Sequence, residues 1–563
     1  MANLPQDSLV LYKSGPARIK AVDDKLEIEL EQGRTLRVRP KDVTLLHPGP
    51  MASLNELSLP RGEVEAAWEI LAGSTTSLAE LAELAYGAYT PATAWAAWRL
   101  VAEGLYFQGT PQAVLARSQE DVHREQAARA ARIAEEAAWG AFLERVQAGH
   151  TAAGDAAFLR EVEELALGRR EKSRVLHALG RPQSPESAHA LLLKLGWWDV
   201  TVNPHPPRVG ATMQPPAAEL PELPQEGRVD LTHLPAYAID DEGNADPDDA
   251  LSLEGGRIWV HVADAAALVA PDSPADLEAR ARGATLYLPE ATVTMLPPQA
   301  TQRLGLGLNA VSPALSFGLD VGGGGEVRSL ELVPSWVRVQ RLTYAEVEQR
   351  LDQAPFADLH RLALAYRERR RQRGAVLIDL PEVRIRVTGG RVDIRPLPRL
   401  GSRVMVSEAM LMAGEAAARF ALDRGIPFPF TTQDPPDVYN PGEGLAGAYA
   451  MRRSLKRRQH KSVPGPHSGL GLSAYAQVTS PLRRYLDLVA HQQLGAYLRG
   501  RGLLETQAMV ERVGAAEAVT ATVRQAERLS RMHWTLVWLQ GHPEWRGSGI
   551  LVDKRPPRGT VLI

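Results

Sequence analysis

A proline-rich segment near the middle of the chain sets the strongest limit on how the chain folds. Residues 203–227 read NPHPPRVGATMQPPAAELPELPQEG. Because proline fixes its own backbone torsion and lacks an N–H donor, neither a long helix nor a central strand can run through this segment. Alanine- and leucine-rich helical sequence precedes it, whereas strand-like and helical runs mix after it. The segment therefore predicts a linker between two structurally different halves.

The two halves divide further, because 563 residues are too many for one core and about two to four domains are expected. We predict an α+β multidomain protein with a small β-barrel at 1–50 and a helical, winged-helix-like region at 51–202. The linker at 203–229 leads into a large mixed α/β domain at 230–541. Residues 542–563 read as the first strands of another barrel.

Local patterns in the N-terminal half leave alternatives open. Thr90 before Pro91 is typical of a helix N-cap followed by proline at the first helical position. The surrounding helix, turn, helix and hairpin pattern predicts a winged helix, with an ordinary helical bundle as the alternative. Residues 184–198 predict the start of a second helix-turn-helix unit. The barrel at 1–50 is expected to serve in structure or docking, with RNA contact as the alternative.

Composition excludes several classes of function. The 64 Lys and Arg residues are balanced by 67 Asp and Glu, so nucleic-acid binding would have to rest on local basic patches. Cysteine is absent, which excludes disulfides and thiolate metal sites and suits a reducing cytoplasm, where we expect the protein to act. The N-terminal residues do not resemble a signal peptide, and no apolar window of about 18 residues exists, so no membrane association is expected.

Six acidic residues crowd into the segment IDDEGNADPDDA at 239–250. Carboxylates this close repel one another, and a folded chain needs a countercharge to hold them together. Apolar, strand-like runs lie on both sides, so the acids are expected on a loop between strands. Carboxylates on a rigid loop suit hard divalent cations, and two such cations about 4 Å apart can assist a phosphoryl displacement. The segment therefore predicts a two-metal site.

The acidic loop has two other interpretations. A solvated acidic loop without a ligand is the first. A calcium-binding loop is the second, and it fails because Gly243 at the sixth loop position would make Ala238 the first ligand.

A second motif, PGPHSGLGLSAYAQVTSPLRRYLD at 464–487, discriminates between these interpretations. Its glycines and small residues allow a ligand to approach the backbone. Thr479, Ser480, Arg483 and Arg484 offer hydroxyl groups and guanidinium forks that suit phosphate. Combined with the acidic loop, this motif predicts a phosphate clamp opposite the metal ions.

Several motifs together resemble the ribonuclease II/ribonuclease R family of exoribonucleases. They are AIDDEGNADPDDALS, VHVADA, YLPEATVTMLP, SEAMLMA and PGPHSGLGLSAYAQVTSPLRRY, and the resemblance covers about 231–539. It implies an RNB-type catalytic domain at 230–541 and an OB-type barrel that begins at 542–563. It also implies a metal-dependent hydrolase that degrades single-stranded RNA from the 3′ end to nucleoside 5′-monophosphates.

The resemblance also assigns the metal site. The family's four metal-site aspartates fall on Asp240, Asp246, Asp248 and Asp249, with Mg²⁺, or Mn²⁺ in its place, as the expected ion. Asp248 is the one whose loss is expected to abolish catalysis. Asp241 and Glu242 occupy variable positions and are expected to be solvated.

Roles at the substrate follow in the same way. Arg483 matches the arginine at the scissile-end phosphate, and Glu517 falls where a family glutamate assists cleavage. Tyr287 matches an aromatic residue that stacks near the 3′-terminal base, and Glu408 matches a carboxylate near the ribose. Thr479, Ser480 and Arg484 complete the expected RNA-binding set.

Three features depart from the family pattern. Leu377 and Ile378 lie where a second stacking aromatic residue is expected, and Gly414 replaces an expected asparagine. The N-terminal half predicts one barrel with helical elements, whereas family members often carry two cold-shock barrels there.

We therefore expect a monomeric, processive 3′→5′ exoribonuclease. One alternative is a catalytically silent RNA-binding relative, which the retained aspartates and Arg483 disfavour. Another is a DNA-binding regulator that acts through the winged-helix-like half, which the near-neutral charge of residues 63–117 disfavours. A phosphatase or nuclease of another metal class would share the acids but lack TSPLRRY.

Overall fold

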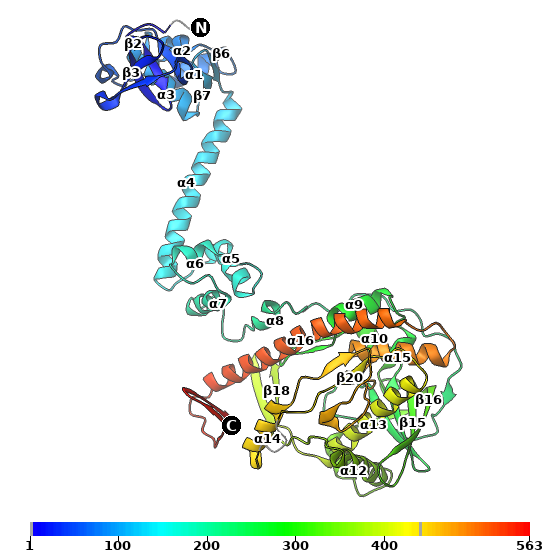
Figure 1. Cartoon of the computed structure of the whole chain (residues 1–563). Coiled ribbons are helices and arrows are strands. Elements are labelled where there is room, and N and C mark those ends of the chain that lie inside the picture. Colours follow the sequence, from blue (N-terminus) through cyan, green and yellow to red (C-terminus); the bar gives the residue numbers. More distant parts are fainter. Residues whose placement is uncertain (1–3, 438–441, 563) are drawn as a thin grey trace. The chain divides into compact units, whose positions relative to one another are not determined.

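A computed structural model describes residues 4–437 and 442–562 (Figure 1). The chain forms two compact units, residues 1–148 and residues 149–563. Each unit mixes helices and strands, which confirms the predicted α+β multidomain class. The division at residue 148 lies inside the predicted helical region, and the predicted boundaries at residues 50, 202, 229 and 541 stay predictions.

The first unit begins with a five-stranded antiparallel sheet in the order β4-β3-β2-β1-β5. Val38 from one edge strand and Leu45 from the other pack against the same core as Val10, Ile19 and Ile28. The sheet therefore curls around one interior, as predicted for a small barrel. The strands are β1 (Leu9–Tyr12), β2 (Gly15–Val22), β3 (Leu26–Leu30), β4 (Thr35–Val38) and β5 (Val43–His47).

A winged helix follows, as predicted. Thr90 caps its third helix by accepting a hydrogen bond from the Thr93 N–H at 3.3 Å, and Pro91 is the first helical residue. The third helix packs on β5, where Trp95 and Trp98 contact the core around Leu46. The elements are α1 (Val64–Leu71), β6 (Thr75–Thr76), α2 (Leu78–Tyr86), α3 (Pro91–Glu103), β7 (Phe107–Thr110) and β8 (Ala113–Ala116), and α4 (Gln119–Gln147) ends the unit.

The second unit begins with four short helices. Trp197 and Trp198 both donate indole N–H bonds to Glu163, at 2.9 and 2.8 Å, which ties the segment after α7 to α5. The predicted linker contains one of these helices, and residues 209–228 form neither helix nor strand. The helices are α5 (Ala156–Ala166), α6 (Arg174–Ala178), α7 (Pro185–Lys194) and α8 (His205–Arg208).

A seven-stranded sheet in the order β17-β10-β11-β12-β15-β16-β9 is the centre of the second unit. Its outer pairs, β17 with β10 and β16 with β9, are parallel, and the inner pairs are antiparallel. The strands are β9 (Val229–Asp230), β10 (Ala236–Asp240), β11 (Asp249–Glu254), β12 (Arg257–Ala263), β15 (Ser312–Val321), β16 (Val327–Val337) and β17 (Val339–Thr343).

Helices bury both faces of this sheet. Ile239 and Val260 point into a core built with α12 and α13, whereas Ala238 and Trp259 point into a core built with α9, α10, α15 and α16. The helices are α9 (Pro274–Arg282), α10 (Pro298–Leu304), α11 (Tyr344–Glu348), α12 (Phe356–Gln372), α13 (Gly401–Asp423), α14 (Gly444–Ser454), α15 (Tyr485–Leu498) and α16 (Thr506–Gln540).

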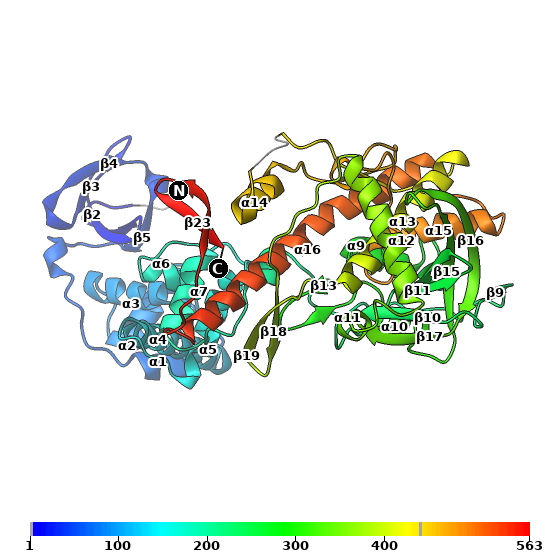
Figure 2. The same ribbon diagram turned by 90° about the horizontal axis from the view of Figure 1, so that it is seen from below.

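Four short antiparallel strand pairs lie outside the sheet in the described part of this unit. In Figures 1 and 2 the long helix α16 runs past the β18–β19 hairpin, and the two are packed together. The pairs are β13 (Leu286–Tyr287) with β14 (Thr292–Val293), β18 (Val383–Thr388) with β19 (Arg391–Pro396), β20 (Phe430–Thr432) with β21 (Gln459–Lys461), and β22 (Ile550–Arg555) with β23 (Arg558–Leu562). Among the described residues, no helix is long and apolar enough to cross a membrane.

Candidate active site

An open cleft of about 1140 Å³ lies in the second unit. The acidic loop between β10 and β11 forms one side, and the loop that precedes α15 forms another. Strand β13, the β18 strand and α13 complete the walls. The cleft brings together most of the residues that the sequence singled out. They are Asp240, Asp246, Asp249, Tyr287, Thr479, Ser480, Arg483 and Arg484.

The acidic loop owes its position to the strands on either side. Asp240 ends β10 and Asp249 begins β11, and the two strands pair antiparallel. Gly243 has a φ of +75°, which permits the turn between them. Asp248 is buried beneath the cleft and is 2% exposed. Adjacent elements of the sheet therefore hold the four aspartates on one loop.

Burial makes these carboxylates costly to ionise. It raises the pKa of Asp248 to about 8 and that of Asp249 to about 6, with Arg483 lowering both. Burial also raises the pKa of Asp240. Carboxyl groups that share a desolvated site lose protons reluctantly unless a cation compensates them. The site therefore favours a bound positive charge.

Arg483 supplies one such charge. Its Nε lies 3.0 Å from Asp248 Oδ2, and its Nη2 donates to Ser480 Oγ at 3.0 Å. The Leu482 backbone N–H donates to Asp248 Oδ1 at 2.9 Å, so the arginine loop is joined directly to the acidic loop. Although burial opposes its charge, Asp248 raises the pKa of Arg483, which stays a cation.

The neighbouring Arg484 is held differently. Its Nη2 lies 2.6 Å from Asp487, whose carboxylate also accepts the Ser480 N–H at 2.9 Å. Two adjacent arginines thus face the cleft from a loop fixed by buried hydrogen bonds, an arrangement that suits a phosphate group.

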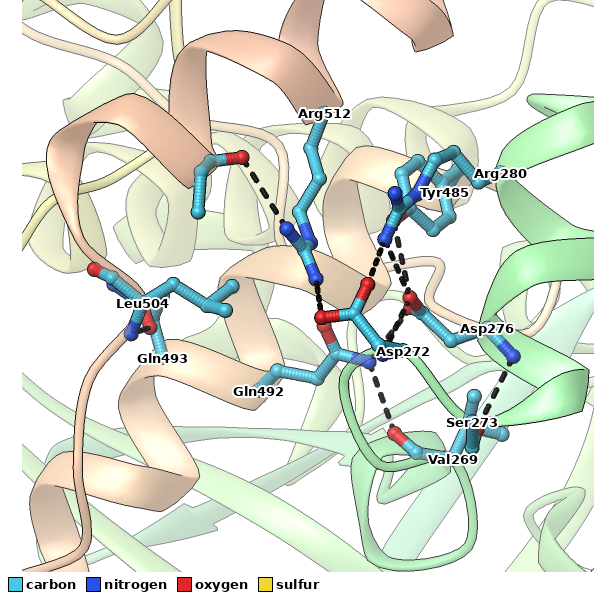
Figure 3. Close-up of polar contacts among 11 residues, drawn as sticks. Val269, Asp272, Ser273, Asp276, Arg280, Tyr485, Gln492, Gln493, Leu504 and Arg512 are labelled. Carbon is cyan, nitrogen blue, oxygen red and sulfur yellow. Dashed lines mark hydrogen bonds and ion pairs between the residues drawn. The ribbon is translucent and has the colours of Figure 1, made fainter.

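The same loop is anchored from behind by a polar network, which Figure 3 shows. Tyr485, the first residue of α15, accepts a hydrogen bond from Arg280 Nε at 2.9 Å. Buried Asp276 accepts bonds from Arg280 at 3.1 Å and from Gln492 at 3.0 Å. Asp272 joins Arg280 and the buried Arg512, at 2.6 and 2.7 Å. The network fixes α9, α15 and α16 to one another, and with them the start of α15.

The carboxylates suit a divalent cation in their chemistry. Three of them line the cleft, and all four offer the oxygen donors that Mg²⁺ or Mn²⁺ takes. Within the described part of the chain, however, no three His, Asp or Glu side chains are already arranged as metal ligands. Asp248 faces Arg483, and Asp246 accepts a hydrogen bond from the Tyr287 hydroxyl. Metal binding would therefore exchange these contacts for coordination.

Tyr287 lines the cleft and is 38% exposed, so it is not a core residue. Shielding from solvent and the adjacent Asp246 raise the pKa of its hydroxyl. Its backbone N–H donates to Glu527 Oε1 at 2.9 Å, and burial raises the pKa of Glu527. The sequence pattern alone does not single out Glu527 of α16 as a site residue.

Glu517 and Glu408 do not line the cleft. Glu517 bonds to His460 and lies 3.6 Å from Arg457. Glu408 is buried and makes a bidentate ion pair with Arg370, with contacts from 2.6 to 3.0 Å. The structure does not bring either glutamate to the other predicted site residues.

Asp241 differs from its expectation. It was expected to be solvated, but it pairs with Arg403 of α13 and lies 2.9 Å from Arg384 of β18. Its partners lie far away in sequence, so no local pattern could reveal the pairing. Glu242 is exposed, as expected.

The structure shows what surrounds Gly414 and residues 377–378, where the sequence differs from the family pattern. A Cβ at Gly414 would lie 2.3 Å from the ring of Tyr475, so a larger residue there would displace that ring. Tyr475 and Tyr344 both line the cleft, whereas Leu377 and Ile378 do not. The cleft thus has aromatic walls beyond Tyr287, supplied from other segments.

Comparison with known proteins agrees with this site. The RNB domain family matches residues 228–448 and 445–500, and a double helix-turn-helix domain matches residues 122–204. An uncharacterized ribonuclease of Synechocystis sp. is 32% identical, over 92% of this chain and 86% of that protein. The chloroplastic/mitochondrial ribonuclease II of Arabidopsis thaliana is 31% identical, over 63% of this chain and 48% of that protein. Exoribonuclease 2 of Edwardsiella piscicida is 32% identical, over 54% of this chain and 55% of that protein.

Solved structures share the fold. RNase R of Mycoplasma genitalium, in complex with ribose-methylated single-stranded RNA, matches with a TM-score of 0.53 and 19% identity, over 59% of this chain and 62% of that chain. An active-site mutant of the exoribonuclease Dss1 from Candida glabrata matches with a TM-score of 0.65 and 16% identity, over 100% of this chain and 93% of that chain. Because the Synechocystis match spans most of both proteins and the RNB match covers the cleft, the chain belongs to the ribonuclease II/ribonuclease R family.

Proposed function

We propose that the protein is a 3′→5′ exoribonuclease that hydrolyses single-stranded RNA processively to nucleoside 5′-monophosphates. The observation that carries this proposal is the meeting of the acidic loop and Arg483 in one cleft of an RNB-family chain. The Mycoplasma structure, which shares the fold, was solved with single-stranded RNA.

The phosphate is held by the loop that precedes α15. Arg483 presents a guanidinium fork beside the aspartates, and Arg484 presents a second one at the same wall. The hydroxyls of Thr479 and Ser480 also face the cleft and can donate to phosphate oxygens. As negative charge grows on the phosphate during hydrolysis, fixed cationic donors stabilise it.

The 3′ end is held by Tyr287. Its half-exposed ring lies on the cleft wall and can stack on the terminal base, while its hydroxyl contacts Asp246 next to the reacting phosphate. Glu527 supports the β13 backbone at this point. The ribose contact that the family pattern gives to Glu408, and the assisting role it gives to Glu517, are not part of this proposal.

Asp240, Asp246, Asp248 and Asp249 would hold two divalent cations, Mg²⁺ or Mn²⁺. When bound, such ions lower the pKa of a water and offset charge on both the attacking and leaving oxygens.

The two alternatives fit the structure less well. A silent RNA-binding relative has no need of the buried Asp248–Arg483 pair beside three further acids. A DNA-binding regulator would present helix α3 to the major groove. That helix packs on β5, Arg99 is its one basic residue, and the tryptophans Trp95 and Trp98 lie partly in the shared core.

The test is digestion of a 5′-labelled single-stranded RNA, with and without EDTA, and with single-stranded DNA of the same sequence as the control. We expect a ladder that shortens from the 3′ end, disappears with EDTA and does not form on DNA. Internal cleavage, or full activity in EDTA, would refute the proposal.

A further inference from the structure

A cluster of arginines lies beside the cleft, where three segments meet. Strand β21 packs on α16, and His460 of β21 bonds to Glu517 of α16. The loop before α15 reaches the same part of α16. The backbones of Arg484 and Ala284 form an isolated antiparallel β-bridge. The neighbouring Gly283 lies close to Thr520 of α16.

These contacts place Arg458, Arg484 and Arg524 on neighbouring segments. Arg458 directly precedes β21, and Arg524 lies two turns beyond Glu517 on α16. Loss of solvent around its guanidinium, with the charges of Arg524 and Arg484, lowers the pKa of Arg458. Its side chain is nevertheless exposed, so a ligand can reach it.

The cluster has more positive charge than its acidic neighbours neutralise. Within the described residues, neither Arg458 nor Arg524 has an ion-pair partner. Glu517 is engaged by His460 and by Arg457, and Asp487 by Arg484 and the Ser480 N–H. Arg484 Nε is buried without a hydrogen-bond partner. Guanidinium groups on neighbouring segments whose acidic neighbours are already engaged by other donors favour binding of an anion.

We propose that Arg458, Arg484 and Arg524 form a phosphate-binding subsite for an internal phosphodiester of the RNA strand. Arg484 also lines the catalytic cleft, so the subsite continues the path that leads to the aspartates. This inference rests on the proposed function, because it takes the anion to be RNA backbone. The subsite adds a contact to the RNA backbone on the 5′ side of the scissile phosphate, and this contact does not depend on the identity of the base.

The first test measures binding of a short fluorescent single-stranded RNA in EDTA over a range of salt concentrations. Each phosphate contact contributes about 0.7 to the slope of log K against log salt for single strands. We expect R458Q and R524Q each to reduce the slope by about 0.7. The control is R361Q, which removes one exposed arginine from α12, paired with Asp358 at 3.0 Å. It should keep the wild-type slope.

The second test locates the phosphate. Uncharged methylphosphonate groups replace the RNA phosphates one at a time, and wild-type affinity should fall most at one internal position. R524Q should lose little more affinity at that position, because the contact is already gone. Combining R524Q with the methylphosphonate RNAs also excludes an indirect effect through Glu527, whose ionisation the Arg524 charge favours. R458Q, which removes a charge from a different segment, serves if R524Q does not fold.

The outcomes separate the two proposals. If wild type neither binds nor shortens RNA, the proposed function fails. If wild type digests RNA but the variants keep its salt slope and its methylphosphonate profile, the subsite is overturned and the function stands.

Discussion

Asp248 is held by two partners of different kinds, a backbone N–H from Leu482 and the guanidinium of Arg483. Asparagine has the same shape and can still accept the Leu482 bond, but it has no charge. We expect Asp248→Asn to slow cleavage at least about 100-fold, the scale of losing one strong transition-state contact. RNA affinity should change little, because most phosphate contacts lie elsewhere.

Gel digestion and anisotropy binding in EDTA check this expectation. The control is Asp320→Asn, which removes a carboxylate that pairs with Arg257 at 2.8 Å, outside the cleft. Comparable hydrolysis by Asp248→Asn and wild type would remove Asp248 from the catalytic site.

Arg483 uses two separate nitrogens, Nε toward Asp248 and Nη2 toward Ser480. Lysine keeps the charge but cannot span both partners and a phosphate. Loss of one charged hydrogen bond costs about 1.5–3 kcal/mol, so Arg483→Lys should lower kcat about 10- to 100-fold and Arg483→Ala further. Equal rates for lysine and arginine would leave only a general electrostatic role.

Two substitutions at Tyr287 distinguish the role of its ring from the role of its hydroxyl group. Tyr287→Phe keeps the ring and loses the bond to Asp246, whereas Tyr287→Ala loses both. Stacking on one base is worth about 1–3 kcal/mol. Only the alanine variant should therefore stall on short RNA and leave a longer limit product on a sequencing gel. If both variants leave the wild-type product, Tyr287 does not stack on the substrate.

At the scale of elements, the start of α15 depends on the network in Figure 3. Asp276 is 0% exposed and accepts bonds from Arg280 and Gln492. Asp276→Ala removes the acceptor that Arg280 and Gln492 share, although Arg280 keeps Asp272 and Tyr485 and Gln492 keeps the Val269 carbonyl. Because Arg280 is partly exposed, the cost should lie below the about 3–5 kcal/mol of breaking a fully buried ion pair. We expect a lower thermal midpoint for this variant. Asp358→Ala, which breaks the exposed α12 pair with Arg361, should leave the midpoint near that of wild type.

The same scale shows what the sequence could not predict. The aspartate loop and TSPLRRY are each an uninterrupted run of residues, so the local sequence pattern is enough to find each of them. Which glutamate of the 35-residue helix α16 faces the site depends on how that helix packs. In the packed helix Glu527 contacts the Tyr287 backbone, whereas Glu517 contacts His460. Helical periodicity does not determine such a rotation.

At the scale of the whole molecule, the change from helical to mixed helix and strand patterns along the chain predicts the fold class. The sequence does not predict the division into two units at residue 148. Helix α4 is continuous from Gln119 to Gln147, and no proline or glycine run marks its end. The compact unit formed by 149–563 contains every residue of the cleft.

We therefore expect a fragment of residues 149–563 to fold and to cleave short RNA with a kcat close to that of the full chain. Its affinity for long RNA should fall, by up to about 100-fold if the first unit offers a linked second binding surface. Circular dichroism checks folding, and digestion of short and long RNA checks activity. A folded fragment that cannot cleave short RNA would show that residues 1–148 complete the site.

The bond between Asp248 and the Leu482 backbone joins positions 234 residues apart. During synthesis on the ribosome, the acidic loop emerges long before its arginine partner exists. Asp248 then lacks both the backbone N–H and the guanidinium that hold it in the folded chain. On the proposed function, we expect hydrolytic competence to arise only when Leu482 and Arg483 have left the exit tunnel. We therefore expect a chain that terminates before Leu482 to be unable to hydrolyse RNA, including the messenger RNA that encodes it.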